Sequence, residues 1–180
     1  MGREIRRVPP NWEHPKESVY NYRGVLEERY TPMYDSSYIE SLNDWLKERT
    51  EWENGTHETL IEHPEYKEQY PHYASYGGNP PNIEDYRPNW KPEEMTWYQV
   101  YETVSGGTPV TPPFETKEEI VEYLVQHGDF WDQKRRQEGD SIMRCDPWTR
   151  EQAERFVGVG WAPSFIGTSA GIVEGAKFIP

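Results

Sequence analysis

The stretch that decides the fold runs from Tyr101 to Leu124 and reads YETVSGGTPVTPPFETKEEIVEYL. Residues 97–104, at its start, allow two interpretations: a helix with apolar side chains on one side, or a strand of aromatic and β-branched residues. We favour the strand, because Gly106-Gly107 ends the run abruptly. Thr108 to Thr111 then has the proline and β-branched character of an edge strand.

A helix follows this pair of strands. Thr116 and Glu119 have the spacing of a capping box, in which each side chain accepts a hydrogen bond from a backbone N–H of the first turn. Gly128 is suited to end the helix. Thr149 and Gln152 repeat the pattern and predict a second capped helix through Val157. After it, the sequence WAPSFIGTSAGIVEGAKF indicates two short strands around a turn.

The clearest helical periodicity lies earlier, from Ser37 to about Asn54. Five apolar residues fall near one face there, and Ser37 with Glu40 predicts another capping box, with Gly55 as the C-terminal stop. We interpret its two tryptophans as core residues rather than as a surface that stacks bases. The apolar residues of this face are Ile39, Leu42, Trp45, Leu46 and Trp52.

A shorter helix is expected from Pro64 to Tyr70, because the fixed φ of proline suits a first helical turn. Residues 75–92 contain too many glycines and prolines for regular structure, so they predict a long packed loop. Residues 134–140 are charged and are expected to be mobile.

The expected fold is therefore α+β, with a small, mostly antiparallel sheet, three or four helices and an extended N-terminal arm. We expect residues 1–33 to form the arm, anchored by its aromatic side chains, and residues 34–180 to form a single domain. The sheet is expected to combine residues 97–104 with the strands around Phe165 and Ile172.

The charge of the chain limits its partners. Its 32 acidic and 19 basic side chains give a formal charge of −13, which argues against direct binding to nucleic acid, because lysine and arginine must neutralise the phosphates. Two basic clusters stand out, Arg3, Arg6 and Arg7 and, later, residues 134–136. They are either solvated surface or anion contacts across the interface of a homo-oligomer.

The remaining composition indicates a cytoplasmic protein. The single cysteine, Cys145, cannot form an internal disulfide, and no apolar run approaches the length of about 18 residues that spans a bilayer. The first residues lack the apolar region of a signal peptide. We expect no membrane partner, and for Cys145 the expectation is a mobile thiol.

No catalytic site emerges. The five histidines are scattered without the spacing of a zinc site, and Ser105-Gly106-Gly107 is too short for a dinucleotide fingerprint and lacks a P-loop lysine. The many carboxylates allow no acid and base pair to be assigned. We therefore predict no catalytic residue, no metal and no cofactor.

The order of elements resembles a known group. The residues YQVYETVSGGTPVTPPFETKEEIVEYL and, later, TREQAERFVGVGWAPSFI look like a widespread group of small proteins encoded by tailed phages and prophages. The start GREIRRVPPNWEHP extends the resemblance. Gly106 replaces an expected glutamate and Pro113 a usual valine, which weakens the edge strand. The resemblance implies a viral accessory or virion role in an infected bacterial cell and assigns no catalytic residue.

Three functions remain open. The first is a phage anti-defence protein that sequesters a nucleotide-like ligand, since the loops are rich in aromatic and hydroxyl groups. The second is an acidic inhibitor that mimics nucleic acid and binds a host defence protein. The third is a minor virion or assembly component. We favour the first, because the acidic residues are spread along the chain. The predicted ligand-binding residues are Tyr101, Ser105, Gly107, Thr108, Trp161 and Ser164.

Overall fold

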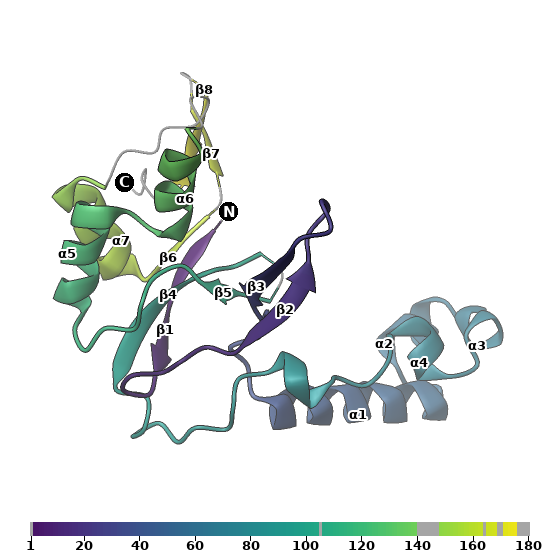
Figure 1. The fold of residues 1–180 in the computed structure, drawn as a ribbon. Helices are drawn as coiled ribbons and strands as arrows, with labels where there is room; N and C mark the ends of the chain where they lie inside the picture. Colours follow the sequence, from purple (N-terminus) through teal and green to yellow (C-terminus); the bar gives the residue numbers. More distant parts are fainter. Residues whose placement is uncertain (1, 105, 140–147, 164, 169–170, 176–180) are drawn as a thin grey trace. The chain divides into compact units, whose positions relative to one another are not determined.

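The structure, a computed structural model, describes residues 2–104, 106–139, 148–163, 165–168 and 171–175 (Figure 1). Its fold is α+β, as predicted. The contacts divide the chain into two compact units, the first comprising Met1–Pro32 and Trp90–Pro180 and the second Met33–Asn89. This division differs from the expected ranges 1–33 and 34–180, because the N-terminal segment belongs to the unit that contains the main sheet.

The first unit is built on a four-stranded sheet. Its strands are β1 (Arg3–Val8), β4 (Trp97–Glu102), β5 (Thr108–Pro109) and β6 (Trp161–Ala162), in the order β5-β4-β1-β6, and every neighbouring pair is antiparallel. The strand preferred for residues 97–104 is confirmed, although it ends at Glu102. The sequence predicted no strand at β1, which lies inside the sheet and pairs with β4 along its whole length.

The two faces of this sheet meet different surroundings, because successive side chains of a strand alternate between faces. On one face, Val100 of β4 lies in the hydrophobic core, with Ile5 of β1 opposite it in register. On the other face, Gln99 and Tyr101 are also buried, but they are polar and contact the segment around His14. The sheet thus separates an apolar core from a polar cluster.

Three helices in the described residues of this unit cover the sheet or extend from it: α5 (Lys117–His127), α6 (Phe130–Glu138) and α7 (Arg150–Val159). The predicted capping boxes at the starts of α5 and α7 are both present. Helix α6 was not predicted, although Asp129 and Asp132 form a third capping box. α5 and α7 pack on each other. The buried residues of the core are Val100, Val110, Ile120, Val121, Leu124, Trp148, Ala153, Phe156, Val157 and Ala162.

Two hairpins lie outside the main sheet. Strands β2 (Lys16–Tyr20) and β3 (Leu26–Tyr30) pair in one, and β7 (Phe165–Thr168) and β8 (Gly171–Glu174) pair in the other. The expectation that the strands around Phe165 and Ile172 join the main sheet was therefore wrong. A separate hairpin satisfies their backbone hydrogen bonds with each other.

The second unit is helical. It contains α1 (Tyr38–Asn54), α2 (Glu58–Glu62), α3 (Tyr66–Gln69), α4 (Tyr73–Tyr76) and the short 3₁₀ helix η1 (Ile83–Asp85). Gly55 ends α1 in the left-handed conformation, with φ of 73°, as predicted. Ser37 precedes α1 but its side chain makes no capping hydrogen bond, so the capping box expected there is absent.

Trp52 is the centre of this unit. Its side chain is fully buried, its ring stacks on that of Tyr76 at 4.3 Å, and its indole N–H donates to the carbonyl of Tyr70. The expected single apolar face of α1 divides in two, because Ile39 and Leu46 are exposed while Trp52 is buried. None of the helices that the structure describes is long and apolar enough to cross a membrane.

Candidate functional site

The first unit contains an open cleft of about 780 Å³. It lies beside the edge strand β5, where residues 109–113 form one side. The N-terminal segment and the β2–β3 hairpin form a second side, and α5 and α6 form a third. The aromatic side chains among the described lining residues are Trp12, His14, Tyr30, Tyr123 and Phe130.

The floor of the cleft is a chain of hydrogen bonds. Tyr101 Oη lies 3.1 Å from His14 Nδ1 and 3.0 Å from Gln99 Oε1. The other nitrogen of His14, Nε2, lies 2.7 Å from the carbonyl oxygen of Thr31. Gln99 Nε2 donates to the carbonyl of Thr111 at 2.8 Å. These bonds connect the sheet, its edge strand and the N-terminal segment.

The electrostatic surroundings of His14 favour its neutral form. Burial lowers the pKa of His14, and the nearby positive charge of Arg6 lowers it further, whereas the hydrogen bond to the Thr31 carbonyl opposes them. Since the ordinary pKa of histidine is already near 6.5, the imidazole is neutral at pH 7. Arg6 itself lies over the ring of Tyr101, 4.4 Å from its centre.

A second polar pair lies on the helical side of the cleft. Gln133 Nε2 of α6 donates to Tyr123 Oη at 3.0 Å and to the carbonyl of Gly128 at 3.2 Å. Both hydrogens of this amide are therefore used. Within the described residues, the hydroxyl hydrogen of Tyr123 and Gln133 Oε1 have no partner. They provide one donor and one acceptor beside the cleft.

The outer part of the cleft combines accessible rings with a positive charge. Phe130 is 46% exposed and Tyr30 is 37% exposed, although both line the cleft. Lys16 Nζ lies 5.1 Å from the centre of the Tyr30 ring. Among the described lining residues, Lys16 is the one lysine or arginine and Glu13 the one carboxylate. The cleft is therefore close to neutral within an acidic protein.

The structure places most of the predicted ligand-binding residues elsewhere. Thr108 Oγ1 donates to Glu102, and Trp161 is exposed on β6. Gly107 has φ of 101°, and a Cβ atom at this position would lie 2.1 Å from Arg6 Nη2, so glycine is required by backbone conformation and close approach. Tyr101 does not line the cleft itself, but its buried hydroxyl group is hydrogen-bonded to His14 and Gln99, which do. Ser105 and Ser164 lie outside the described residues, as does Cys145.

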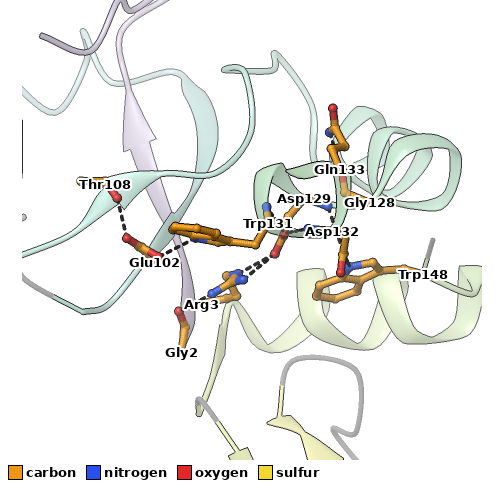
Figure 2. A network of polar contacts seen from close by, with 10 residues as sticks. All are labelled: Gly2, Arg3, Glu102, Thr108, Gly128, Asp129, Trp131, Asp132, Gln133 and Trp148. Atoms are coloured by element: carbon orange, nitrogen blue, oxygen red, sulfur yellow. Dashed lines mark hydrogen bonds and ion pairs between the residues drawn. The ribbon is translucent and has the colours of Figure 1, made fainter. Parts of the chain in front are cut away.

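The contacts of Thr108 belong to a buried polar network (Figure 2). Arg3 is fully buried, and its Nε and Nη2 both lie 2.7 Å from Asp129 Oδ2. Glu102 accepts from Thr108 at 2.8 Å and from the indole N–H of Trp131 at 2.7 Å.

The same network reaches α6 and the segment before α7. Asp129 Oδ1 accepts from the backbone N–H groups of Trp131 and Asp132, and Asp132 accepts from the indole N–H of Trp148. The network joins β1, β4 and α6, which gives it a structural role. Neither surface interpretation of Arg3 holds, since it is buried. Arg6 is also buried and pairs with Glu4.

The described residues provide no metal site, since no three His, Cys, Asp or Glu side chains among them gather around one point. The rings and amide groups that line the cleft suit binding by stacking and hydrogen bonding. The residues that line the cleft were missed because they come from six separate segments, 12–16, 30, 99, 109–113, 123 and 130–133. The one local signal was the density of aromatic residues before Met33, which we interpreted as anchors of the arm.

Comparison of the chain with protein-family models, with curated proteins and with solved structures finds no match. The chemistry of the cleft is therefore the basis for a functional proposal.

Proposed function

We propose that the protein binds a small, planar, nucleotide-like molecule in the cleft and sequesters it without catalysis. The observation that carries this proposal is the cleft itself, with a volume of about 780 Å³ and a lining of rings and amides. Ligand sites in proteins are typically cavities of roughly 300–1,000 Å³ with apolar walls and few polar groups. The cleft has this size and this composition.

The lining matches the two parts of such a ligand. The exposed faces of Tyr30 and Phe130 offer stacking surfaces for a base. The amide and hydroxyl groups of Gln133 and Tyr123 offer a donor and an acceptor for its polar edge. Lys16 supplies one positive charge for a phosphate near the opening of the cleft. With one lysine, the cleft suits a singly charged phosphodiester better than a triphosphate.

In the biological setting that we propose, this protein is an accessory protein of a tailed phage and acts in the cytoplasm of the infected host. The support is the resemblance of its C-terminal half and of its first residues to proteins of phages and prophages. A phage that removes a nucleotide signal from solution would blunt a host defence that depends on that signal. A homo-oligomer in which each copy binds one ligand is compatible with this role.

Calorimetric titration against cyclic and linear nucleotides tests the proposal. Phe130→Ala removes an accessible ring from the cleft and should weaken binding by roughly 5- to 100-fold, since stacking contributes about 1–3 kcal/mol per base. Val159→Ala is the matched control, because Val159 is 63% exposed on α7 and does not line the cleft. Absence of binding across the panel, or equal affinity of both variants, would exclude the cleft as the binding site.

A second candidate function is favoured by the charge of the second unit. Met33–Asn89 carries 12 acidic and 4 basic side chains, a formal charge of −8, whereas the rest of the chain carries −5. The acidic residues are thus denser here than we expected. This concentration supports the alternative proposal of an inhibitor that presents carboxylates to a basic host protein.

The two candidates predict that different variants lose activity in cells whose defence the phage overcomes. If the protein is an acidic inhibitor, replacing Glu58, Glu62 and Glu68 of the second unit with glutamine should abolish its protection of the phage against the host defence. If the protein sequesters a ligand, Phe130→Ala should abolish that protection. All three glutamates are exposed and line no described part of the cleft, so the triple variant leaves the ligand site intact.

A further inference from the structure

The floor of the cleft contains two acceptors that compete for one hydrogen. Gln99 Nε2 donates to the Thr111 carbonyl, which leaves Gln99 Oε1 directed toward Tyr101 Oη. His14 Nε2 faces the Thr31 carbonyl, which can only accept, so this nitrogen carries the hydrogen of the ring. In neutral His14, Nδ1 is therefore an acceptor, and it too faces Tyr101 Oη.

A tyrosine hydroxyl group has one hydrogen to donate. Within the part of the chain that the structure describes, His14 Nδ1 lacks a donor when Tyr101 donates to Gln99, and Gln99 Oε1 lacks one when Tyr101 donates to His14. Both acceptors belong to residues that line the cleft and are at most 6% exposed. A buried acceptor without a donor is costly, so a group that supplies a hydrogen from the cleft side is favoured.

We infer that the floor of the cleft, formed by Gln99 and His14 with the buried Tyr101 hydroxyl group between them, selects ligands whose planar ring carries an N–H donor, such as the amino group of adenine or cytosine. This inference rests on the proposed function and specifies the ligand class of the same site. The ligand donates to one of the two competing acceptors, while Tyr101 donates to the other.

The helical side of the cleft extends this selection. The donor of Tyr123 and the acceptor Gln133 Oε1 complement a ring edge on which an acceptor and a donor are neighbours. The amino group and adjacent ring nitrogen of adenine or cytosine form such an edge. The floor and the helical side of the cleft therefore both favour an amino-substituted base over a ring of the same shape without the amino group.

Pairs of ligands that differ only in this amino group test the inference on the unaltered protein. One pair is adenosine 3′,5′-cyclic monophosphate and its analogue with hydrogen in place of the 6-amino group, and the second is the corresponding cytidine pair. We expect the amino compound of at least one pair to bind about 5- to 100-fold more tightly, because its analogue buries an acceptor without a donor. A preference below five-fold in both pairs would overturn the inference and leave the proposed function standing. Absence of binding by all four compounds would overturn the inference, and absence of binding across the wider panel of cyclic and linear nucleotides would overturn the proposed function as well.

Two variants separate recognition from general stability. Gln99→Met removes one acceptor, so Tyr101 donates to His14 without competition and the preference for the amino compound should fall to the part that Gln133 Oε1 contributes. Tyr101→Phe removes the shared hydrogen, leaves both acceptors open, and should keep or increase the preference. The ratio of affinities within a ligand pair is the measured quantity, so a general loss of affinity does not imitate either result. Equal ratios in the two variants would contradict the assignment.

Acidification provides an independent test. A proton on His14 Nδ1 lets His14 donate to Tyr101, whose hydrogen then satisfies Gln99, and the open acceptor is lost. The amino preference should therefore fall as His14 becomes protonated, and a ratio that stays constant over the pH range in which the ring signals of His14 titrate would contradict the inference. The charged or titratable groups around His14 and the cleft, among the described residues, are Arg6, Tyr101, Tyr30, Tyr123, Glu13 and Lys16. Cyclic phosphodiesters are suitable probes because they lack the phosphate ionisation near pH 6.

Discussion

The two units of this protein bury their polar groups in different ways. In the first unit, the fully buried Arg3 pairs with Asp129, a residue 126 positions away in the chain. In the second unit, the buried Trp52 donates to the carbonyl of Tyr70, only 18 positions away. The first unit thus depends on charge pairs between distant segments, and the second on rings from neighbouring helices. Each unit should therefore fail through a different kind of substitution.

The largest effect is expected for Trp52→Ala in the second unit. Removing a buried aromatic side chain costs about 3–5 kcal/mol, and a core of this size rarely supplies more than that. Residues 33–89 should lose their protection from hydrogen exchange, while β1 and β4 keep theirs. Ile61→Ala, at a side chain that is 71% exposed, is the control and should change little. Equal loss of protection in both units would show that they fold as one.

Arg3→Ala should destabilise the first unit by about 3–5 kcal/mol, because it leaves the carboxylate of Asp129 buried without its cation. Chemical denaturation measures this loss of stability, and hydrogen exchange at β4 and α6 shows whether the loss falls on the first unit. Arg29→Ala removes an exposed ion pair with Glu27 and should cost less than about 1 kcal/mol. A similar cost for the two variants would contradict the structural role of the buried network.

A smaller effect is expected for Trp131→Phe, which removes the indole N–H that donates to Glu102. Leaving a buried acceptor unpaired costs about 1–3 kcal/mol. Trp12→Phe is the matched control, since the buried indole N–H of Trp12 has no acceptor within the described residues. The difference between the urea midpoints of the two variants measures the contribution of the Trp131–Glu102 hydrogen bond to stability. An equal shift of both midpoints would show that only the loss of ring volume matters.

The smallest effect concerns His14 and pH. Its pKa is lowered in the folded protein, by burial first and by Arg6 second, so the unfolded chain binds the proton more tightly. The stabilising contribution is complete above the ordinary pKa of about 6.5 and is lost as the pH falls through the lower folded value. Urea midpoints should therefore drop between pH 7 and 5, and drop less in His14→Gln. An identical pH dependence in both proteins would rule out His14 as the cause.

Local chemistry made part of this fold predictable. In each predicted capping box the two residues lie three positions apart, Thr116 with Glu119 and Thr149 with Gln152. The predicted starts of α5 and α7 were therefore correct. Helix α6 was missed because its charged sequence has little apolar periodicity, although Asp129 and Asp132 carried a capping signal. Strand β1 was missed because its arginines suggested a surface, and the partner that buries Arg3 is distant in sequence.

The candidate site was less predictable than the fold. Thr108 and Gly107 were predicted to bind a ligand because they are a hydroxyl residue and a glycine in a loop. In the structure, however, Thr108 donates to Glu102, and Gly107 lies against Arg6. His14 was set aside as one of five scattered histidines, since Tyr101 lies 87 positions away. Sites assembled from distant segments leave no spacing pattern for sequence reasoning to detect.

The most direct test of the account is to follow the indole N–H signals of the eight tryptophans by nuclear magnetic resonance during titration with cyclic nucleotides. Trp12 lines the cleft, whereas Trp45 and Trp52 belong to the second unit. We predict that the Trp12 signal shifts in proportion to ligand bound and that the Trp45 and Trp52 signals stay in place. Shifts confined to Trp45 and Trp52, or no shift at any nucleotide concentration, would contradict the claim that the cleft is the functional site.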